Sequence, residues 1–420
     1  MQQQSAYKVI ALFITQIILC VFGTQIFVIR ANPFALLLIS VLFTYNCALL
    51  LRHSPVTALK SDRYTPWLHA LLAVAMVATQ YNALSRIFES VPDPGLKSDV
   101  LPQLKAQALL FFSGQFPYQP ITTAAKHPYP VYLPLQWLPL QFSNLTGIDQ
   151  RWPGIILFAI AVGLSGYLLR KYHASIAIKY SLPATFLLVV PLWGFVKWSK
   201  IDLALSSEGI VAFWYILLAT GLAIKRLPLV VIGIIGGLLS RYSLLFWLPM
   251  FALLLWYYEP KRYSVITWGI VGISVLCLFV FPFLLKDPSI LSKMSAHYGG
   301  CDAKSWVSPD EYTFLDGLSL NIHLREWMKG NPIDTLKYAH FPQFGVQVLC
   351  VLFGFFYYRK KGYQFFDIYT YTLIWLSIMP MLLYLFSPML FKYYMLMPLS
   401  VSAVLCWKVV NTRGIFEKLE

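Results

Sequence analysis

The stretch VIALFITQIILCVFGTQIFVI (residues 9–29) decides the fold class, because it is mostly apolar and carries no charged side chain. The hydrocarbon core of a bilayer is about 30 Å thick, so a helix needs roughly 20 mostly apolar residues to cross it. This stretch has that length. It is too long for the apolar core of a signal peptide, and no small-residue cleavage site follows it. We therefore expect an uncleaved first membrane helix.

Similar apolar stretches recur along the 420 residues, of which 58% are hydrophobic and 12% are charged. Soluble globular proteins carry about 25% charged residues. We therefore predict an all-α polytopic membrane protein that forms one membrane domain over residues 1–420. By length and apolarity we expect about twelve spans, over approximately 8–29, 33–51, 67–88, 153–169, 180–197, 204–224, 227–240, 242–258, 264–285, 341–358, 365–386 and 389–408. The glycine-rich region 227–258 fits either two helices or one broken helix.

Short basic connections between the spans indicate the orientation of the chain. They cover residues 52–66, 170–179, 225–226, 259–263 and 359–364. Lys and Arg are enriched in cytoplasmic loops, so these connections and both termini are expected in the cytoplasm. The two long polar loops, 89–152 and 286–340, then face outside. We expect a multi-pass protein of a bacterial inner membrane.

The net charge of +15 does not indicate a nucleic-acid partner, because the basic residues are scattered singly at helix ends and in loops. Their expected contacts are the headgroups of membrane lipids. Of the six cysteines, only Cys301 lies in a long polar loop. A disulfide framework needs several cysteines outside the membrane, so none is expected.

Some basic residues contradict the orientation rule, because they fall at outer helix ends or in very short outer loops. They are Arg30, Lys197, Lys200, Arg241 and Lys392. For Arg30 we favour a side chain that reaches outward to the lipid headgroups. The other four either do the same or share a role in binding an anion, since a charge at membrane depth usually faces a cavity or a partner.

The first outer loop begins with a predicted interfacial helix over residues 98–113. Ser98 can act as its N-cap, with Asp99 in the first turn, and Gly114 suits its C-terminal end. One apolar stripe runs along this helix at helical spacing through Leu101, Leu104, Ala108 and Phe111 or Phe112. Such a helix lies in the plane of the membrane surface.

Prolines recur after this helix from Pro117 to Pro139, including the stretch HPYPVYLPL (residues 127–135). They forbid a continuous spanning helix. Irregular backbone at membrane depth is tolerated only where protein buries it or where it lines a cavity. The segment is therefore either a capping loop with interfacial aromatic residues or the wall of an active site, with its rings against sugar or isoprenoid groups.

Together these pieces resemble the GT-C superfamily of integral-membrane glycosyltransferases, and most closely its bacterial mannosyltransferase-like branches. The matching segments in the outer loop are Asp99, Gly114 to Tyr118 (Gly-x-x-Pro-Tyr) and Tyr129 to Leu135. Two later segments also agree with the family, namely GGLLSRYSLLFWLP (residues 236–249) and FKYYMLMP (residues 391–398). The resemblance implies a GT-C-like fold and transfer of a sugar from a polyprenyl-phosphate donor to a lipid or glycan acceptor.

The resemblance also implies roles for particular residues. Asp99 would be the general base that takes the proton of the acceptor hydroxyl, which attacks the anomeric carbon with inversion. Cations at membrane depth would stabilise the departing phosphate, and these are Arg241, Lys200 and Lys392. The residues expected to contact substrate are Tyr118, Tyr129, Tyr132 and Asp202.

The metal requirement is left open by one departure from the family pattern. Many such enzymes carry a second acidic residue beside the first, whereas Ser98 precedes Asp99 here. Asp93 lies between two prolines and suits a turn. Since the histidines are scattered and no metal-ligand spacing occurs, we expect no obligatory metal or other cofactor, although a divalent metal is not excluded.

The alternative class is a multi-pass transporter or a flippase for lipid-linked glycans. About twelve spans, with both termini on the same side of the membrane, would fit this class. Coupled transporters usually need carboxylates at mid-membrane or matched broken helices, however. The predicted spans hold few acidic residues apart from Asp202 and Glu208, which lie near an outer end.

Overall fold

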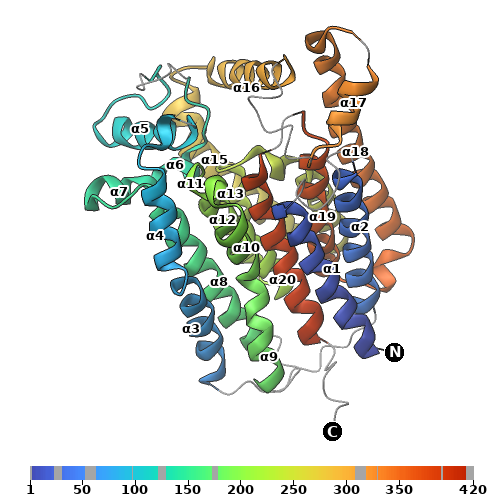
Figure 1. Ribbon diagram of the computed structural model, residues 1–420. Helices are drawn as coiled ribbons and strands as arrows, with labels where there is room; N and C mark the ends of the chain where they lie inside the picture. Colours follow the sequence, from blue (N-terminus) through green and yellow to red (C-terminus); the bar gives the residue numbers. More distant parts are fainter. Residues whose placement is uncertain are drawn as a thin grey trace.

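The computed structural model describes residues 2–22, 31–52, 63–96, 98–121, 129–172, 178–307, 318–328, 330–388 and 391–412. Arg30 and most of the predicted loop 52–66 lie outside these ranges. Every regular element in the described ranges is a helix. The long helices stand side by side in a bundle, and shorter helices cover one end of it (Figure 1).

The helices follow one another along the chain as α1 (Gln2–Phe22), α2 (Asn32–Leu51), α3 (Thr65–Ala78), α4 (Tyr81–Ser90), η2 (Pro94–Leu96), α5 (Val100–Phe112), α6 (Pro134–Trp137), η3 (Leu138–Leu140), α7 (Gln141–Thr146), α8 (Trp152–Tyr172), α9 (Ile178–Ala184), η4 (Thr185–Leu188), α10 (Val190–Trp198), α11 (Lys200–Ala204), α12 (Glu208–Ala223), α13 (Leu227–Leu238), η5 (Tyr242–Phe246), α14 (Leu248–Tyr258), α15 (Lys261–Val275), η6 (Leu276–Leu284), α16 (Ile290–Val307), α17 (Asn321–Trp327), α18 (Pro332–Lys360), η9 (Gly362–Gln364), α19 (Ile368–Leu385), η10 (Lys392–Met395) and α20 (Leu396–Thr412). The element η6 is a π-helix, and the other η elements are 3₁₀ turns.

Seven helices in the described ranges are long and apolar enough to cross a membrane, and the bent pair Ser181–Leu188 and Val190–Trp198 makes an eighth if it is one span. The seven are Asn32–Leu51, Thr65–Ser90, Trp152–Tyr172, Lys261–Leu284, Pro332–Lys360, Ile368–Leu385 and Lys392–Asn411. The protein is therefore an all-α multi-pass membrane protein. The count of about twelve spans stays a prediction, and the shorter apolar helices include α12, α13 and α14.

The region 227–258 is interrupted in the middle. Helix α13 ends at Leu238, α14 begins at Leu248, and the 3₁₀ turn η5 lies between them. Arg241 takes an extended backbone at this break, with φ −153° and ψ 138°. A backbone that leaves the helix inside an apolar region exposes its polar groups, which is tolerated where protein buries them or where they line a cavity.

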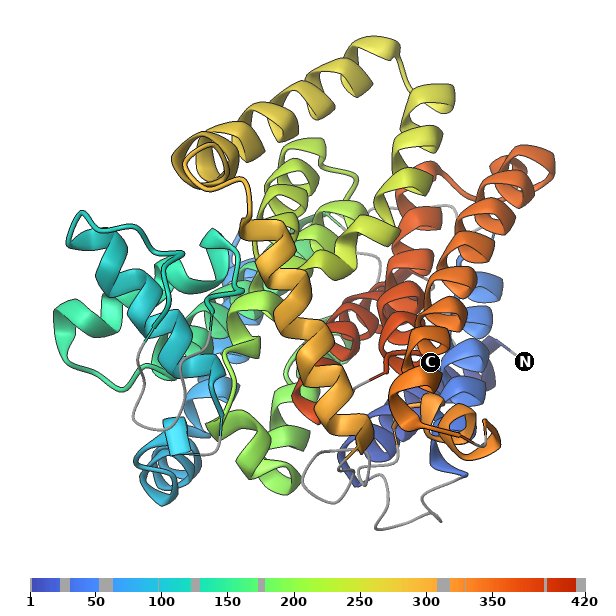
Figure 2. The same cartoon turned by 90° about the horizontal axis from the view of Figure 1, so that it is seen from above.

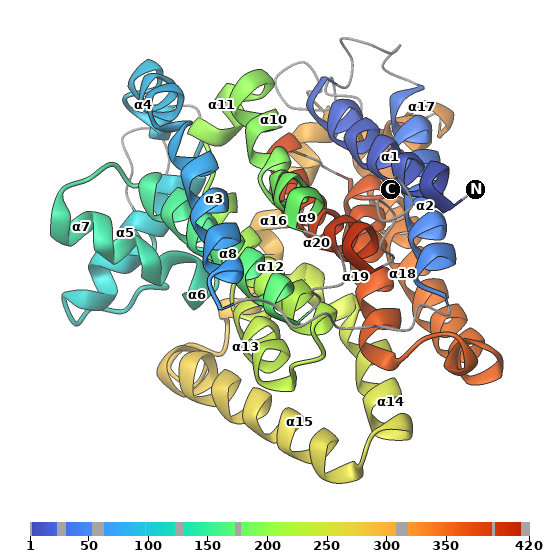
Figure 3. The ribbon, with the colours of Figure 1, turned by 90° about the horizontal axis from the view of Figure 1, so that it is seen from below.

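The two predicted outer loops form the helices that cover one end of the bundle. From above, α16 lies across the centre of this end, with α5 to α7 on one side (Figure 2). Helix α1 begins and α20 ends at the opposite end (Figure 3). Helix α18 begins at Pro332, inside the predicted second loop 286–340. The side chain of Asn331 accepts the N–H of Ile333 and caps this helix, which moves its start outward from the predicted residue 341.

Helix α5 lies within the range 98–113, where the sequence predicts an interfacial helix. Of its expected stripe, Leu101, Leu104 and Ala108 are fully buried, while Phe111 and Phe112 at its C-terminal end are exposed. Gly114 takes the left-handed conformation, with φ 77°, at the end of the helix. The N-cap position belongs to Asp99 instead of Ser98. Ser98 Oγ still accepts the N–H of Val100 at 3.3 Å, so the Asp99 carboxylate is left free of capping.

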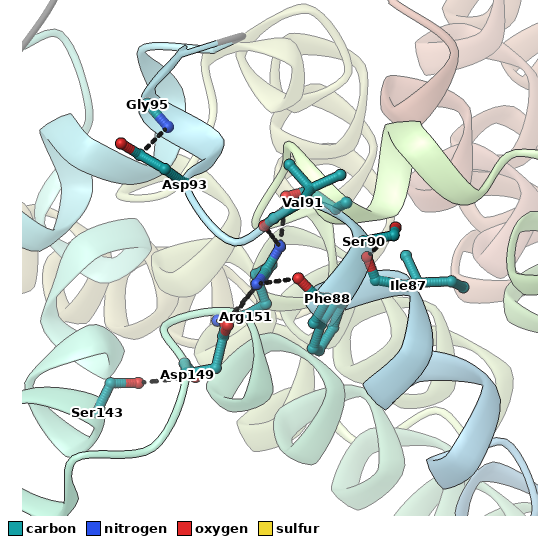
Figure 4. A network of polar contacts seen from close by, with 10 residues as sticks. Ile87, Phe88, Ser90, Val91, Asp93, Gly95, Ser143, Asp149 and Arg151 are labelled. Carbon is teal, nitrogen blue, oxygen red and sulfur yellow. Dashed lines mark hydrogen bonds and ion pairs between the residues drawn. The ribbon is translucent and has the colours of Figure 1, made fainter.

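Arg151 fixes the end of the first loop to the bundle (Figure 4). Its guanidinium is buried and forms an ion pair with Asp149. It also donates to the carbonyls of Phe88 and Val91, both at 2.9 Å, and to that of Ala204 at 3.4 Å. One side chain thus connects the start of α8, the end of α4 and the end of α11.

Candidate functional site

The break between α13 and η5 directs the side chain of Arg241 toward the first residue of α12. There it forms an ion pair with Glu208, whose side chain is only 2% exposed. Glu208 lies at the N-terminal end of α12, where the helix dipole favours a negative charge. The guanidinium also lies over the ring of Tyr394, with 4.6 Å between Cζ and the ring centroid. Arg241 is therefore held in one place by a charge and by an aromatic ring.

Arg241 lines a cavity of about 330 Å³ between the bundle and the covering helices. The wall is rich in tyrosine and in hydrogen-bonding side chains, which come from segments far apart in the sequence. The polar residues that line it include Tyr132, Gln136, Arg241, Ser243, Tyr298, Asp302, His340, Gln343, Tyr384 and Tyr394. An aromatic cavity with a few polar groups is the usual form of a small-molecule site.

Two phenylalanine rings lie where this cavity meets the outer surface of the bundle. Phe246 and Phe344 both line the cavity, and their ring centroids are 5.5 Å apart. Phe344 is 47% exposed and belongs to α18, a helix with many exposed apolar side chains. In a membrane such side chains face lipid, so this side of the cavity opens near the lipid phase.

Asp99 lies beside the cavity and is absent from the residues that line it. Its Oδ2 accepts a hydrogen bond from Nε2 of Gln103 at 2.9 Å. The same oxygen lies 3.7 Å from Nε2 of His297 on α16. Tyr132 connects it electrostatically to the cavity. Burial raises the pKa of Tyr132 well above its usual range, and the nearby Tyr298 and Asp99 add to this effect.

The two lysines and the acid predicted to share the site lie on two other elements that pack together, α11 and η10. Lys200 is exposed, while Asp202 and Lys392 are half-buried. None of the three lines the cavity around Arg241. The structure therefore brings Arg241 next to Tyr394, two residues after Lys392, and leaves both lysines outside this cavity.

Tyr118 and Tyr129 also lie apart from Arg241. Tyr118 is buried, and its hydroxyl donates to the carbonyl of Tyr132 at 2.9 Å, which fixes the proline-rich segment. Burial, together with Asp287, raises the pKa of Tyr129 to about 12. Tyr118 borders a second hollow of about 580 Å³ that also carries Lys286 and Lys293. Hydrogen bonds from Lys293 and Ser289 lower the pKa of Asp287 there to about 2.

Sequence reasoning missed the residues that α16 and α18 bring to the cavity, namely Tyr298, Asp302 and His340. The stretch HYGGCD (residues 297–302) concentrates an imidazole, a phenol, a thiol and a carboxylate in one polar segment. That density of reactive side chains was the available signal. Their shared cavity depends on contacts across many residues, which no local pattern contains.

The side chains that could ligate a metal are dispersed over the structure. In the described ranges, no three His, Cys, Asp or Glu side chains come together in a way that could hold a metal ion. The expectation that no metal is obligatory stays a prediction.

No protein-family model, curated protein or solved structure matches this chain. The function is therefore inferred from the sequence, the geometry of the cavity and the chemistry of the residues around it.

Proposed function

We propose that the protein is a glycosyltransferase that moves a sugar from a polyprenyl-phosphate donor to a hydroxyl of a lipid or glycan acceptor. The observation that carries this proposal is the half-buried Arg241, which Glu208 holds on the wall of an aromatic cavity. The GT-C resemblance of the outer loop points to the same reaction. On this proposal the cavity faces the outside of a bacterial inner membrane, and both termini are cytoplasmic.

Arg241 suits the donor phosphate because a guanidinium carries five N–H donors in a planar fork. Glu208 accepts from Nη2, so other donors can bind phosphate oxygens. When the bond between the anomeric carbon and the phosphate oxygen breaks, the phosphate gains charge. A fixed cation stabilises this charge more in the transition state than in the ground state.

The other walls suit the remainder of a lipid-linked sugar. Tyrosine rings and amides such as Gln136 and Gln343 can contact the faces and hydroxyls of a sugar. An isoprenoid chain could leave between Phe246 and Phe344 into the lipid. The GT-C resemblance implies Asp99 as the general base, and its carboxylate makes no capping hydrogen bond to α5.

The test is a binding assay of the detergent-solubilised protein with a polyprenyl phosphate, together with a transfer assay. Arg241→Ala should weaken binding and slow transfer, and Arg241→Lys should recover only part, since the bidentate geometry is lost. Arg241→Ala also leaves Glu208 buried and unpaired, which costs about 3–5 kcal/mol of stability. The double variant Arg241→Met/Glu208→Gln removes both charges and separates a loss of binding from a loss of folding.

The matched control is Arg262→Ala, because Arg262 is exposed at the opposite end of the bundle. It should bind the polyprenyl phosphate as the wild type does. Equal affinity in the wild type and in the folded double variant would remove Arg241 from the site and weaken the glycosyltransferase proposal. Movement of a lipid-linked glycan across proteoliposomes without any sugar transfer would favour the transporter or flippase instead.

A further inference from the structure

The cavity around Arg241 also has a buried acidic residue, Asp302 on α16. Asp302 is only 9% exposed and lines the cavity. Its Oδ2 lies 3.7 Å from Nε2 of His340 on α18. Among the residues that the structure describes, no donor forms a hydrogen bond to this carboxylate, and the one ion-pair partner given by the distances is the imidazole of His340.

Such a carboxylate is costly to a fold, since a mostly buried charge that accepts no hydrogen bond loses much of its hydration. Helix α16 is nevertheless fixed so that Asp302 stays there. Four residues further along the helix, Trp306 is fully buried and donates Nε1 to the carbonyl of Pro388 at 3.0 Å. The Asp302 carboxylate lies near His340 but accepts no hydrogen bond from the described residues, so it suits a ligand group that brings its own hydrogen, such as a hydroxyl.

We propose that Asp302, with His340 beside it, binds the acceptor hydroxyl in the cavity of Arg241 and takes its proton. This inference rests on the proposed glycosyl transfer and names the acceptor-binding half of the same site. The acceptor class is a neutral hydroxyl compound, a sugar or a polyol, and its other hydroxyls would meet Tyr298 and Gln343 on the same wall.

The step balances with the groups already present. The acceptor oxygen forms a bond to the anomeric carbon, and the bond between that carbon and the phosphate oxygen breaks. The electron pair of the broken bond stays on the phosphate, which Arg241 stabilises. The proton of the hydroxyl moves to Asp302. His340, whose side chain is 39% exposed, can carry this proton onward to solvent.

Two further properties of Asp302 agree with this role. Burial raises the pKa of its carboxyl to about 7, and a general base works best when its pKa lies near the working pH. The neighbouring segments bring other titratable and charged groups to the region. These are His340 from α18, Tyr298, His297 and Cys301 on α16 itself, the Arg241–Glu208 pair, Tyr384 from α19, Tyr394 from η10, Tyr132, and Asp99 beside α5.

Asp99 then has a positioning task, in place of the role as base that the GT-C resemblance implies. Its carboxylate is engaged by Gln103 and lies near His297, on the same helix as Asp302. Through His297 it can fix the position of α16 and thus of Asp302. Asp99→Asn would then lower transfer through geometry, whereas Asp302→Asn would remove the base.

The experiment compares the wild type, Asp302→Asn, Asp99→Asn and His340→Gln in single-turnover transfer between about pH 5 and pH 9. The control is Asp334→Asn, since Asp334 is exposed on α18. We expect Asp302→Asn to lose transfer by about 10²-fold or more, with unchanged affinity for a polyprenyl phosphate. Wild-type transfer should rise with pH through about 7, because the base must be ionised, and Asp302→Asn should lose this rise. Near-normal transfer in Asp302→Asn, together with loss of transfer in Asp99→Asn, would overturn the inference. Asp99 would then be the general base.

A second measurement does not depend on glycosyl transfer. Infrared difference spectra of the wild type and Asp302→Asn identify the Asp302 carboxyl band, and an alkyl glycoside serves as the hydroxyl probe. We expect this band to titrate near neutral pH and to shift when the probe is added. If the frequency of this band does not change when the alkyl glycoside is added, the proposed acceptor site is overturned. Failure of the wild type to bind a polyprenyl phosphate, with an intact band shift, would instead reject the proposed donor and leave the hydroxyl site standing.

Discussion

At the scale of single residues, Arg151 illustrates a buried cation with a structural task. Its guanidinium is 2% exposed and has no place in the cavity of Arg241. It lies over the ring of Phe88 at 4.5 Å and reaches three backbone carbonyls besides Asp149. Carbonyls at a helix end have no partner within the helix, so Arg151 satisfies the end of α4 and fixes α11 at the same time.

Arg151→Met should therefore destabilise the protein. Removing one partner of a buried ion pair costs about 3–5 kcal/mol, and we expect the lower part of this range because Asp149 is 33% exposed and can regain water. Thermal unfolding in detergent measures the change. Arg86→Met is the matched control on α4, since Arg86 is exposed and donates only within its own helix. Equal unfolding temperatures for the two variants would contradict the role given to Arg151.

The same scale shows why the sequence identified Arg241 and missed Asp302. Arg241 follows a glycine-rich run and contradicts the orientation rule, so local patterns are enough to single it out. Asp302 and Asp99 look alike in the sequence, as single acids in polar loops. What distinguishes them is burial, which the contact between Trp306 and Pro388 imposes on α16. A contact over that separation has no local signature.

At the scale of helices, glycine allows α12 and α13 to pack closely and to hold the proline-rich segment. A Cβ at Gly236 would meet the ring of Trp214, and a Cβ at Gly233 would meet the backbone of Leu218. The Trp214 ring donates Nε1 to the carbonyl of Leu135 at 3.4 Å, while the N–H of Leu135 donates to the carbonyl of Leu239 at 2.9 Å. The close packing thus reaches the wall that carries Tyr132 and Gln136.

Gly236→Ala should move the Trp214 ring and loosen this wall. Overpacking costs about 1–3 kcal/mol, so we expect a lower unfolding temperature and weaker binding of a polyprenyl phosphate. Gly269→Ala on α15 is the control, because a Cβ there meets nothing within 4 Å. It should be neutral or stabilising by about 0.5–1 kcal/mol, since alanine favours a helix interior. A Gly236→Ala variant as stable as Gly269→Ala would show that the packing has room to relax.

Local patterns predicted the helices themselves better than their ends. The stripe of α5 and the turn at Gly114 follow from spacing and from glycine's conformational freedom, which are properties of neighbouring residues. Turn chemistry was also correct at Asp93, whose carboxylate accepts the N–H of Gly95 at 2.9 Å. Helix α18 begins before the predicted span 341–358, because its first turns are polar and apolarity was the criterion for a span. At Arg241 the local pattern fitted either two helices or one broken helix, and it did not predict the 3₁₀ turn η5 between α13 and α14.

At the scale of the whole molecule, the short basic connections gather at one end of the bundle. Arg52 lies over the ring of Phe365 at 3.5 Å, and Lys225 pairs with Asp367 at 3.0 Å. Arg226 lies over Tyr172 at 4.5 Å. The covering helices α5 to α7 and α16 lie at the other end (Figure 1). Basic connections that share one end agree with the orientation rule, which assigns this end to the cytoplasm.

Cysteine labelling of intact cells tests that orientation directly. A membrane-impermeant maleimide should label Cys301 from outside. Cys301 is half-buried, and its Sγ lies 3.6 Å from Nε2 of His297, so the thiol could be shielded from the reagent. Lys304→Cys places a second thiol at an exposed position of the same helix and serves as a control for this. Lys360→Cys, at the basic end, should react only after the membrane is opened, with the Cys301→Ser background as its control. Labelling of position 360 in intact cells would reverse the orientation. Arg241, Asp302 and Asp99 would then face the cytoplasm, where lipid-linked sugars on the outer leaflet could not reach them.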